Sequence, residues 1–194
     1  EYRLEDEGHT NFSVTQKIQA INDAQIQVIA MCSNDALPHL QVQEDLDTVV
    51  ADSNLGGLYY YALPEPAGEP LLTRVVKAYD NTNKRWIEMV SPHGFGENTS
   101  YSYGTVGTLM RNRLYVSTGD TAITSCILIY IGSAADIADD TNQITETSDS
   151  VQQAIVEMAE ALLWRQDNRQ NRASSAHGSA TALILAINSS GVGA

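Results

Sequence analysis

Three apolar stripes, far apart along the chain, constrain the fold more than any other feature. Residues 13–33 carry apolar side chains at the spacing of an amphipathic helix, and two further stripes begin near Val151 and Ser174. Each stripe has to be buried, and packing the three helices against one another achieves this with the fewest elements. The sequence therefore predicts three packed helices built from the two ends of the chain.

Two of these helices begin with a possible capping box, in which two side chains satisfy free backbone N–H groups reciprocally. Ser13 with Gln16 precedes the first stripe, and Ser150 with Gln153 precedes the second. Both pairs predict a helix start. The last helix is expected over about residues 174–188.

Between the first and second stripes the sequence changes character. Gly, Pro and Asn interrupt short runs rich in Val, Ile, Tyr and Thr, which is typical of strands. Residues 80–83 (DNTN) predict a hairpin turn, and residues 91–98 and 101–107 predict loops. Strands are predicted over residues 46–51, 58–63, 71–79, 85–90, 113–117 and 123–131.

We therefore predict an α+β fold, a three-helix bundle with an inserted antiparallel β-rich subdomain. Residues 1–11 form an N-terminal arm, 12–45 and 133–194 the helical bundle domain, and 46–132 the β-rich insertion. The arm is expected to be ordered by a neighbouring subunit. Two-layer packing of the helices on the sheet is the competing arrangement.

The charge balance limits the possible partners. The chain has 24 acidic and 11 basic residues and a net charge of −13, which argues against binding the outside of DNA or an anionic membrane. DNA passing through a negative-walled channel is compatible with this charge, since like charge prevents adhesion. For a single chain, solubility is the simpler explanation. The apolar runs are too short to span a membrane, and Cys32 and Cys126 are expected to be buried thiols.

The sequence contains no recognisable residue pattern for catalysis or metal binding. The four histidines show no metal-binding spacing, and the sequence has no phosphate-binding loop or nucleophile elbow. Asp136, Asp139, Asp140 and Glu146 lack the turn glycine of a calcium loop, so a solvated acidic loop is the simpler interpretation. We predict no enzyme activity, no catalytic residue, no metal and no cofactor.

The basic residues give the best candidates for a binding surface. Arg165, Arg169 and Arg172 recur every three to four residues around the end of the second helix. Positive charge at a helix C-terminus is favoured by the helix dipole, which is the simpler explanation. A contact patch for acidic partner surfaces is the alternative. The remaining interface candidates are aromatic: Trp164, Phe95, Tyr101 and Tyr103.

The order of these pieces resembles the head-to-tail adaptor (connector) proteins of tailed bacteriophages. The likeness includes the opening amphipathic helix, the Tyr61-Ala62-Leu63-Pro64 sequence that is similar to the family's Y-x-L-P strand, and a Val-rich strand after it. It continues through an Ala-rich helix ending at Trp164 and Arg165, and covers roughly residues 12–188. The resemblance implies a helical bundle with an inserted strand-rich region and no catalytic residues.

The resemblance also implies function by assembly. About twelve copies would form a ring that joins the portal protein to a tail or nozzle protein, extends the channel for genomic DNA without sequence-specific binding, and offers a tail docking surface. Assembly would take place in the host cytoplasm, and the final location would be the neck or tail of the virion. The alternatives are another neck or tail-completion protein, or a small ligand-binding domain.

Overall fold

The computed structural model describes residues 12–53, 58–63, 72–97, 105–117, 123–139 and 148–190 of the 194-residue chain. The chain divides into two compact units. The helical unit comprises Glu1–Leu40 with Ser133–Ala194, and the sheet unit comprises Gln41–Gly132. The predicted N-terminal arm, residues 1–11, lies outside the described residues.

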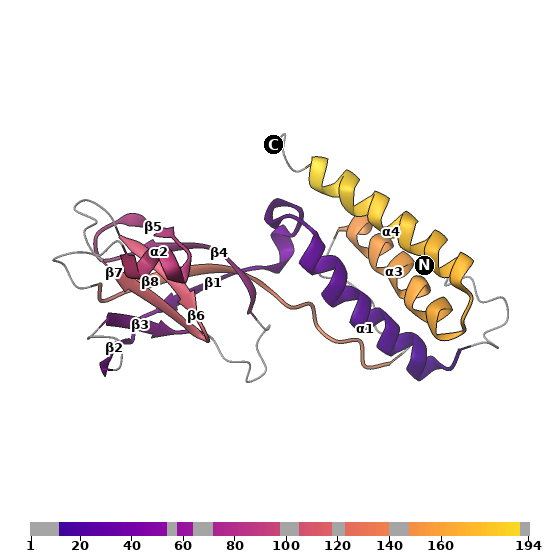
Figure 1. Cartoon of the computed structure of the whole chain (residues 1–194), viewed down its shortest axis with the longest axis horizontal. Coiled ribbons are helices and arrows are strands. Elements are labelled where there is room, and N and C mark those ends of the chain that lie inside the picture. The colour runs from indigo at the N-terminus through magenta and orange to yellow at the C-terminus, as the bar shows by residue number, and fades with distance from the viewer. Residues whose placement is uncertain are drawn as a thin grey trace. The chain divides into compact units, whose positions relative to one another are not determined.

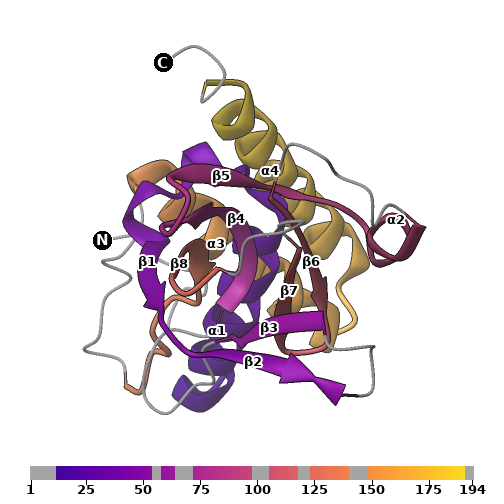
Figure 2. The ribbon, with the colours of Figure 1, turned by 90° about the vertical axis from the view of Figure 1, so that its left-hand side faces the viewer.

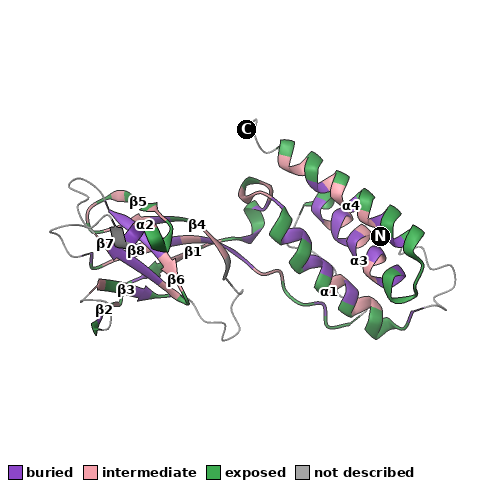
Figure 3. Ribbon diagram, in the orientation of Figure 1, coloured by how far each residue is buried: buried purple, intermediate pink, exposed green. Residues whose placement is uncertain are grey.

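The helical unit is a layer of three helices with α3 in the middle. α1 (Val14–Met31) and α4 (Gln170–Ser190) pack on either side of α3 (Asp149–Gln166), as Figure 1 shows. Small side chains on α3, including Ala154 and Ala161, are fully buried and allow this close approach. Figure 3 shows that α1 and α4 each keep exposed residues along the helix, whereas buried residues are dense on α3.

The start of α1 confirms the first predicted capping box. The Gln16 backbone N–H donates to Ser13 Oγ at 3.3 Å, and the Ser13 N–H donates to Gln16 Oε1 at 2.9 Å. The second predicted box is wrong. α3 starts earlier, at Asp149 with Ser148 as N-cap, so Ser150 already lies inside the helix. In place of a capping box, the helix start has the Asp149 carboxylate in its first turn, where a negative charge interacts favourably with the helix dipole.

The end of α1 is tied to the end of α4. After Met31 the chain continues through two short 3₁₀ helices, η1 (Asn34–Ala36) and η2 (Pro38–Leu40). The side chain of Asn188 in α4 accepts a hydrogen bond from the Ser33 N–H at 2.7 Å and donates to the Met31 carbonyl at 3.1 Å. The bond to Met31 satisfies a carbonyl that the end of α1 leaves without an intrahelical partner.

The sheet unit is an eight-stranded mixed sheet curled into a half-barrel. The strand order is β1-β8-β4-β5-β6-β7-β3-β2, and Figure 2 shows the curl of the sheet. All neighbouring strands are antiparallel except β5 and β6, whose parallel pairing is connected through the short helix α2 (Pro92–Glu97). The strands are β1 (Gln41–Leu46), β2 (Val49–Asp52), β3 (Leu58–Ala62), β4 (Leu72–Asp80), β5 (Arg85–Met89), β6 (Val106–Met110), β7 (Arg113–Ser117) and β8 (Cys126–Gly132).

The predicted architecture of a three-helix bundle with an inserted antiparallel β-rich subdomain is therefore wrong. The described residues contain four α-helices, and the sheet is mixed and large. The sheet buries its inward-facing side chains, such as Tyr61, Leu114 and Leu128, in a core of its own. A segment that forms its own core needs no helix to cover that face. The chain is α+β, with two self-contained cores.

The β4–β5 hairpin confirms the predicted turn at residues 80–83. Asp80 is fully buried, and its carboxylate accepts hydrogen bonds from the Thr82 and Asn83 N–H groups at 3.0 and 2.9 Å. The hydroxyl of Thr105, just before β6, donates to the same carboxylate at 2.9 Å. Asp80 thus connects the β4–β5 turn to the neighbouring strand.

The other face of the sheet carries a second, smaller cluster under α2. Phe95 of α2 packs with Val106 of β6 and Tyr115 of β7. The Tyr115 hydroxyl donates to the buried Asp52 carboxylate at 2.7 Å, and Arg113 pairs with the same carboxylate at 3.1 Å. Residues 92–97 were predicted as part of a loop, and that prediction is wrong, because Phe95 supplies an apolar anchor for a helical turn.

Candidate assembly surface

The predicted arginine patch lies at the corner between α3 and α4. α3 ends at Gln166, and Asn168 takes a left-handed backbone conformation with φ 57° before α4 begins at Gln170. Asparagine tolerates this conformation better than most residues. The Arg169 N–H donates to the Trp164 carbonyl at 2.9 Å and closes the corner. This tight turn brings Arg169 and Arg172 back toward Trp164.

Trp164 organises this corner. It is only 4% exposed, and Phe12, just before α1, meets its ring edge-on with the ring centres 5.2 Å apart. The guanidinium carbons of Arg172 and Arg169 lie 4.8 and 5.3 Å from the centre of the Trp164 ring. Each stacked guanidinium contributes about 0.5–1 kcal/mol at an exposed site. We call Trp164, Phe12, Arg169 and Arg172 the Trp164 cluster.

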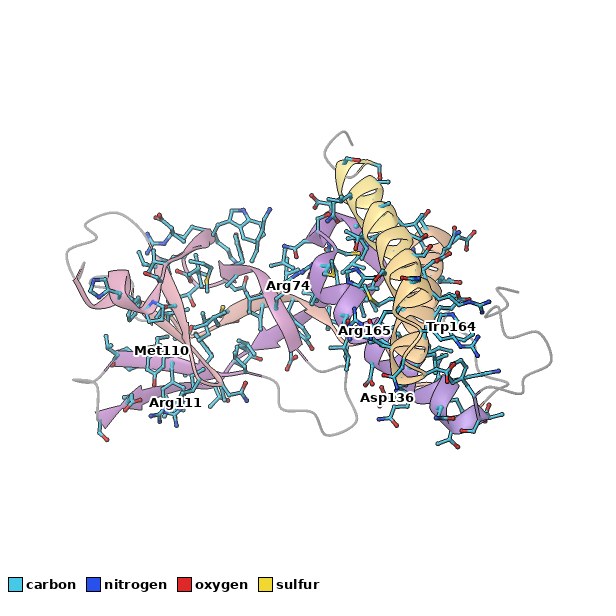
Figure 4. The ribbon with its side chains drawn as sticks, turned by 45° about the vertical axis from the view of Figure 1, so that its right-hand side comes forward. Arg74, Met110, Arg111, Asp136, Trp164 and Arg165 are labelled. Atoms are coloured by element: carbon cyan, nitrogen blue, oxygen red, sulfur yellow. The ribbon has the colours of Figure 1, made fainter. Side chains whose placement is uncertain are left out.

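One acidic residue of the corner pairs with the cluster. Asp167 Oδ2 lies 2.6 Å from Arg169 Nε, and each side chain is a little under half exposed. An exposed pair of this kind contributes little to stability but holds the guanidinium in one orientation. Arg165 is exposed in the last turn of α3, where the helix dipole favours positive charge. Figure 4 labels Trp164 and Arg165 on this unit, together with Asp136 of the segment that precedes α3.

The structure therefore brings together three of the seven predicted interface residues, Trp164, Arg169 and Arg172. Arg165 lies beside them in the last turn of α3, with its side chain exposed. Phe95 belongs to the sheet unit and is 6% exposed, so its ring supports α2 and is not presented to a partner. Tyr101 and Tyr103 lie outside the described residues.

Sequence reasoning missed Phe12 and a second aromatic site on the sheet. Phe12 directly precedes the Ser13 N-cap, a position where an apolar residue often packs onto the helix, and this signal was present in the sequence. On β5, Trp86 is 57% exposed and alternates with buried Ile87. Successive side chains of a strand point to opposite faces of the sheet, so the predicted strand already implied that Trp86 and Ile87 lie on different faces.

The four acidic residues of the possible calcium loop do not gather in the part of the chain that the structure describes. Asp136 and Asp139 are exposed, whereas Asp140 and Glu146 lie outside the described residues. Among the described residues no group of three or more His, Cys, Asp or Glu side chains is placed to hold a metal ion. Within the same residues, no helix has the length and apolar character needed to cross a bilayer.

The two cysteines are buried in different units, Cys32 at the end of α1 and Cys126 in β8. Burial, followed by the nearby negative charge of Asp80, raises the pKa of Cys126 to about 12. Burial likewise raises the pKa of Tyr61, whose hydroxyl donates to the Ile123 carbonyl at 3.2 Å. Both groups are neutral at physiological pH and are part of the sheet core.

Comparison with known proteins adds no family to these observations. No model of a known protein family matches the chain, and no curated protein sequence matches it.

Proposed function

We propose that this chain is a non-enzymatic structural subunit of the neck of a tailed bacteriophage, a head-to-tail adaptor. About twelve copies form a ring that sits between the portal protein and a tail or nozzle protein. The ring extends the DNA channel and offers the tail its docking surface. The support is the order of elements along the chain, an opening helix, a strand-rich segment and two closing helices.

The Trp164 cluster is the observation that carries this proposal. Two guanidinium groups lie close to the ring of a buried tryptophan in a chain whose net charge is −13. Contact with the ring restrains both guanidinium groups, so less side-chain entropy is lost when a carboxylate binds them. A preformed cationic corner on an acidic chain is suited to contact the acidic surface of another copy or of a partner.

Closed rings need two different, complementary surfaces on each subunit. The α3–α4 corner supplies the cationic surface, and the acidic remainder of the chain supplies the other. In such a ring, carboxylates that face the channel would repel DNA and keep it from adhering as it passes.

The test begins with the purified protein, alone and mixed with the portal protein of the same phage. Class averages from electron microscopy are expected to show a ring with the rotational symmetry of the portal. A monomer that neither forms rings nor binds the portal would contradict the proposal. If the chain is instead another neck or tail-completion protein, it would bind the tail protein and would not show the rotational symmetry of the portal.

Arg165→Glu tests the α3–α4 corner with the least structural disturbance, because Arg169 and Arg172 also stack on Trp164. Reversing this charge is expected to weaken ring or portal assembly at least about tenfold. Arg165→Lys keeps the charge and is the matched control. Normal assembly of the Arg165→Glu protein would show that this corner is not the contact surface, while the ring itself would remain to be judged by imaging.

A further inference from the structure

The β4–β5 hairpin carries an exposed aromatic pair. Tyr79 of β4 and Trp86 of β5 lie directly opposite each other, with the ring centres 5.1 Å apart in an edge-on contact. The Lys77 ammonium lies 5.5 Å from the centre of the Trp86 ring. Trp86 is nevertheless 57% exposed. We call Lys77, Tyr79 and Trp86 the Trp86 patch.

The apolar surface continues from this patch across the sheet. Residues that are directly opposite in paired strands point to the same face. Tyr79 pairs with Ile127 of β8, and Ile127 pairs with Asp45 of β1. One row on this face therefore reads Asp45, Ile127, Tyr79, Trp86. Ile127 and Tyr79 are only half-buried, and neither belongs to the core on the opposite face of the sheet.

The basic residues of the sheet unit are confined to two hairpins, and the β4–β5 hairpin also carries the buried Asp80 and the exposed Glu88. All six of its basic residues lie on the β4–β5 and β6–β7 hairpins: Arg74, Lys77, Lys84, Arg85, Arg111 and Arg113. The segment from β1 to β2, residues 41–52, has no basic residue and carries four acidic ones: Glu44, Asp45, Asp47 and Asp52. The exposed Asp45 and Asp47 form an acidic corner at the end of β1.

The acidic corner and the Trp86 patch of one copy are too far apart to neutralise each other. Asp45 and Trp86 are separated by three strand spacings, or about 14 Å. A second copy displaced sideways would place its own acidic corner over Lys77 and Trp86. The same contact would cover the apolar surface of the half-buried side chains Ile127 and Tyr79.

We propose that the Trp86 patch is a docking site for the acidic β1–β2 corner of a second copy of this chain. The contact is head-to-tail, since each copy presents one patch and one corner. Asp45 and Asp47 meet Lys77, and the Trp86 ring is covered by the neighbouring sheet. This inference needs only self-association and does not depend on the phage function proposed above.

Charge reversal on each side tests the contact. Sedimentation velocity of the whole chain at about 0.1 M salt is expected to show self-association that weakens as salt is raised. Lys77→Glu and, separately, Asp45→Lys are each expected to raise the dissociation constant about tenfold or more. Trp86→Ala is expected to weaken association as well, with no change in charge. Lys17→Glu and Asp23→Lys on α1 are the matched charge controls, and circular dichroism checks that every variant is folded.

The decisive arm combines the two reversals. Mixing the Lys77→Glu protein with the Asp45→Lys protein, or placing both changes in one chain, should restore association, because opposite charges again face each other. A wild-type chain that stays monomeric, variants that behave like their controls, or a mixture that is not restored would each overturn the inference. The inference would also be overturned if the Lys77→Glu protein lost binding to duplex DNA while its self-association stayed unchanged. The patch would then be an anion-binding site. Arg165→Glu and Lys77→Glu lie in different units, so failure of one proposal leaves the other to be judged separately.

Discussion

The side chain of Asn22 in α1 forms two hydrogen bonds to the main chain of Ile137. Its Nδ2 donates to the Ile137 carbonyl at 3.1 Å, and the Ile137 N–H donates to its Oδ1 at 2.9 Å. The Asn22 amide therefore pairs with the N–H and the C=O of one residue in this irregular segment, as a neighbouring strand does in a sheet. The buried Gln25 donates to the same Oδ1 at 3.2 Å and fixes its orientation. One residue of the first helix thus holds the segment that leads into α3.

Replacing Asn22 by Ala is expected to lower the free energy of unfolding of the helical unit by about 1–3 kcal/mol. The backbone groups of the buried Ile137 would lose both partners, and burial without a partner is costly. The neighbouring exposed Asp23→Ala is the matched control and is expected to change the free energy by less than about 0.5 kcal/mol. Each unit contains one of the chain's two tryptophans, so Trp164 fluorescence in a Trp86→Phe background reports the helical unit alone during urea unfolding. Equal effects of the two substitutions would show that the Asn22 bonds carry no weight.

Two glycines predict opposite results when changed to alanine. A Cβ on Gly107 of β6 would lie 2.8 Å from Ile87 Cγ2 and 3.4 Å from Leu114 Cδ1, both in the sheet core. Gly107→Ala is expected to destabilise the sheet unit by about 1–3 kcal/mol through overpacking. A Cβ on Gly178 of α4 meets nothing within 4 Å, so Gly178→Ala should stabilise the helical unit by up to about 1 kcal/mol. Urea unfolding of both variants checks the signs, and a stabilising Gly107→Ala would mean that β6 and β5 are not packed this closely.

Asp80 predicts how the sheet unit responds to acid. Burial alone would raise the pKa of Asp80, but hydrogen bonds from Asn83, Thr105 and Thr82 outweigh it and hold the pKa below its ordinary value. The folded pKa is therefore lower than the unfolded value of about 3.9. The ionised carboxylate stabilises the fold above about pH 4, and this stabilisation is lost as the pH falls through the lower, folded pKa.

The comparison of wild type with Asp80→Asn measures this contribution. The wild type is expected to be more stable by about 1–3 kcal/mol at pH 7, because hydrogen bonds to an ionised group are stronger than neutral ones. The difference should shrink below pH 4. Trp86 fluorescence in a Trp164→Phe background follows the sheet unit during urea unfolding at each pH. A difference that stays constant down to pH 2 would show that the charge of Asp80 is not what stabilises the turn.

Local signals in the sequence predicted local structure well. The Ser13–Gln16 box, the turn after Asp80 and the strand at residues 113–117 all depend on neighbours within a few positions, and all are present. β6 was missed because Gly107 made its segment look like a loop. The real need for that glycine is the approach of Ile87 from β5, which is visible only once the sheet has formed.

Long-range pairing could not be predicted in the same way. The parallel pairing of β5 with β6 depends on the path of the chain through α2, and the curl of the sheet depends on all eight strands. At the candidate site, the spacing of the arginines placed them on one corner, but their stacking on Trp164 required the tight turn at Asn168. Phe12 joins the cluster only because α1 packs against α3.

Cys126 gives a chemical test of the sheet core. Its side chain is fully buried, and its pKa of about 12 means that on the order of one thiol in ten thousand is ionised at pH 8. A free cysteine with a pKa of about 8.5 is about one-quarter ionised at that pH, and the thiolate is the form that reacts. In a Cys32→Ala variant, Cys126 is therefore expected to react with an aromatic disulfide reagent about a thousandfold more slowly than a free thiol, and to react fully in concentrated urea.

Burial and ionisation slow the reaction of Cys126 together, because the reagent also cannot reach the sulfur until the sheet opens. Asp80→Asn should speed the native reaction, since it removes a nearby negative charge and loosens the adjacent turn. Reaction of the folded chain at the rate of a free thiol would mean that β8 is not enclosed by the half-barrel.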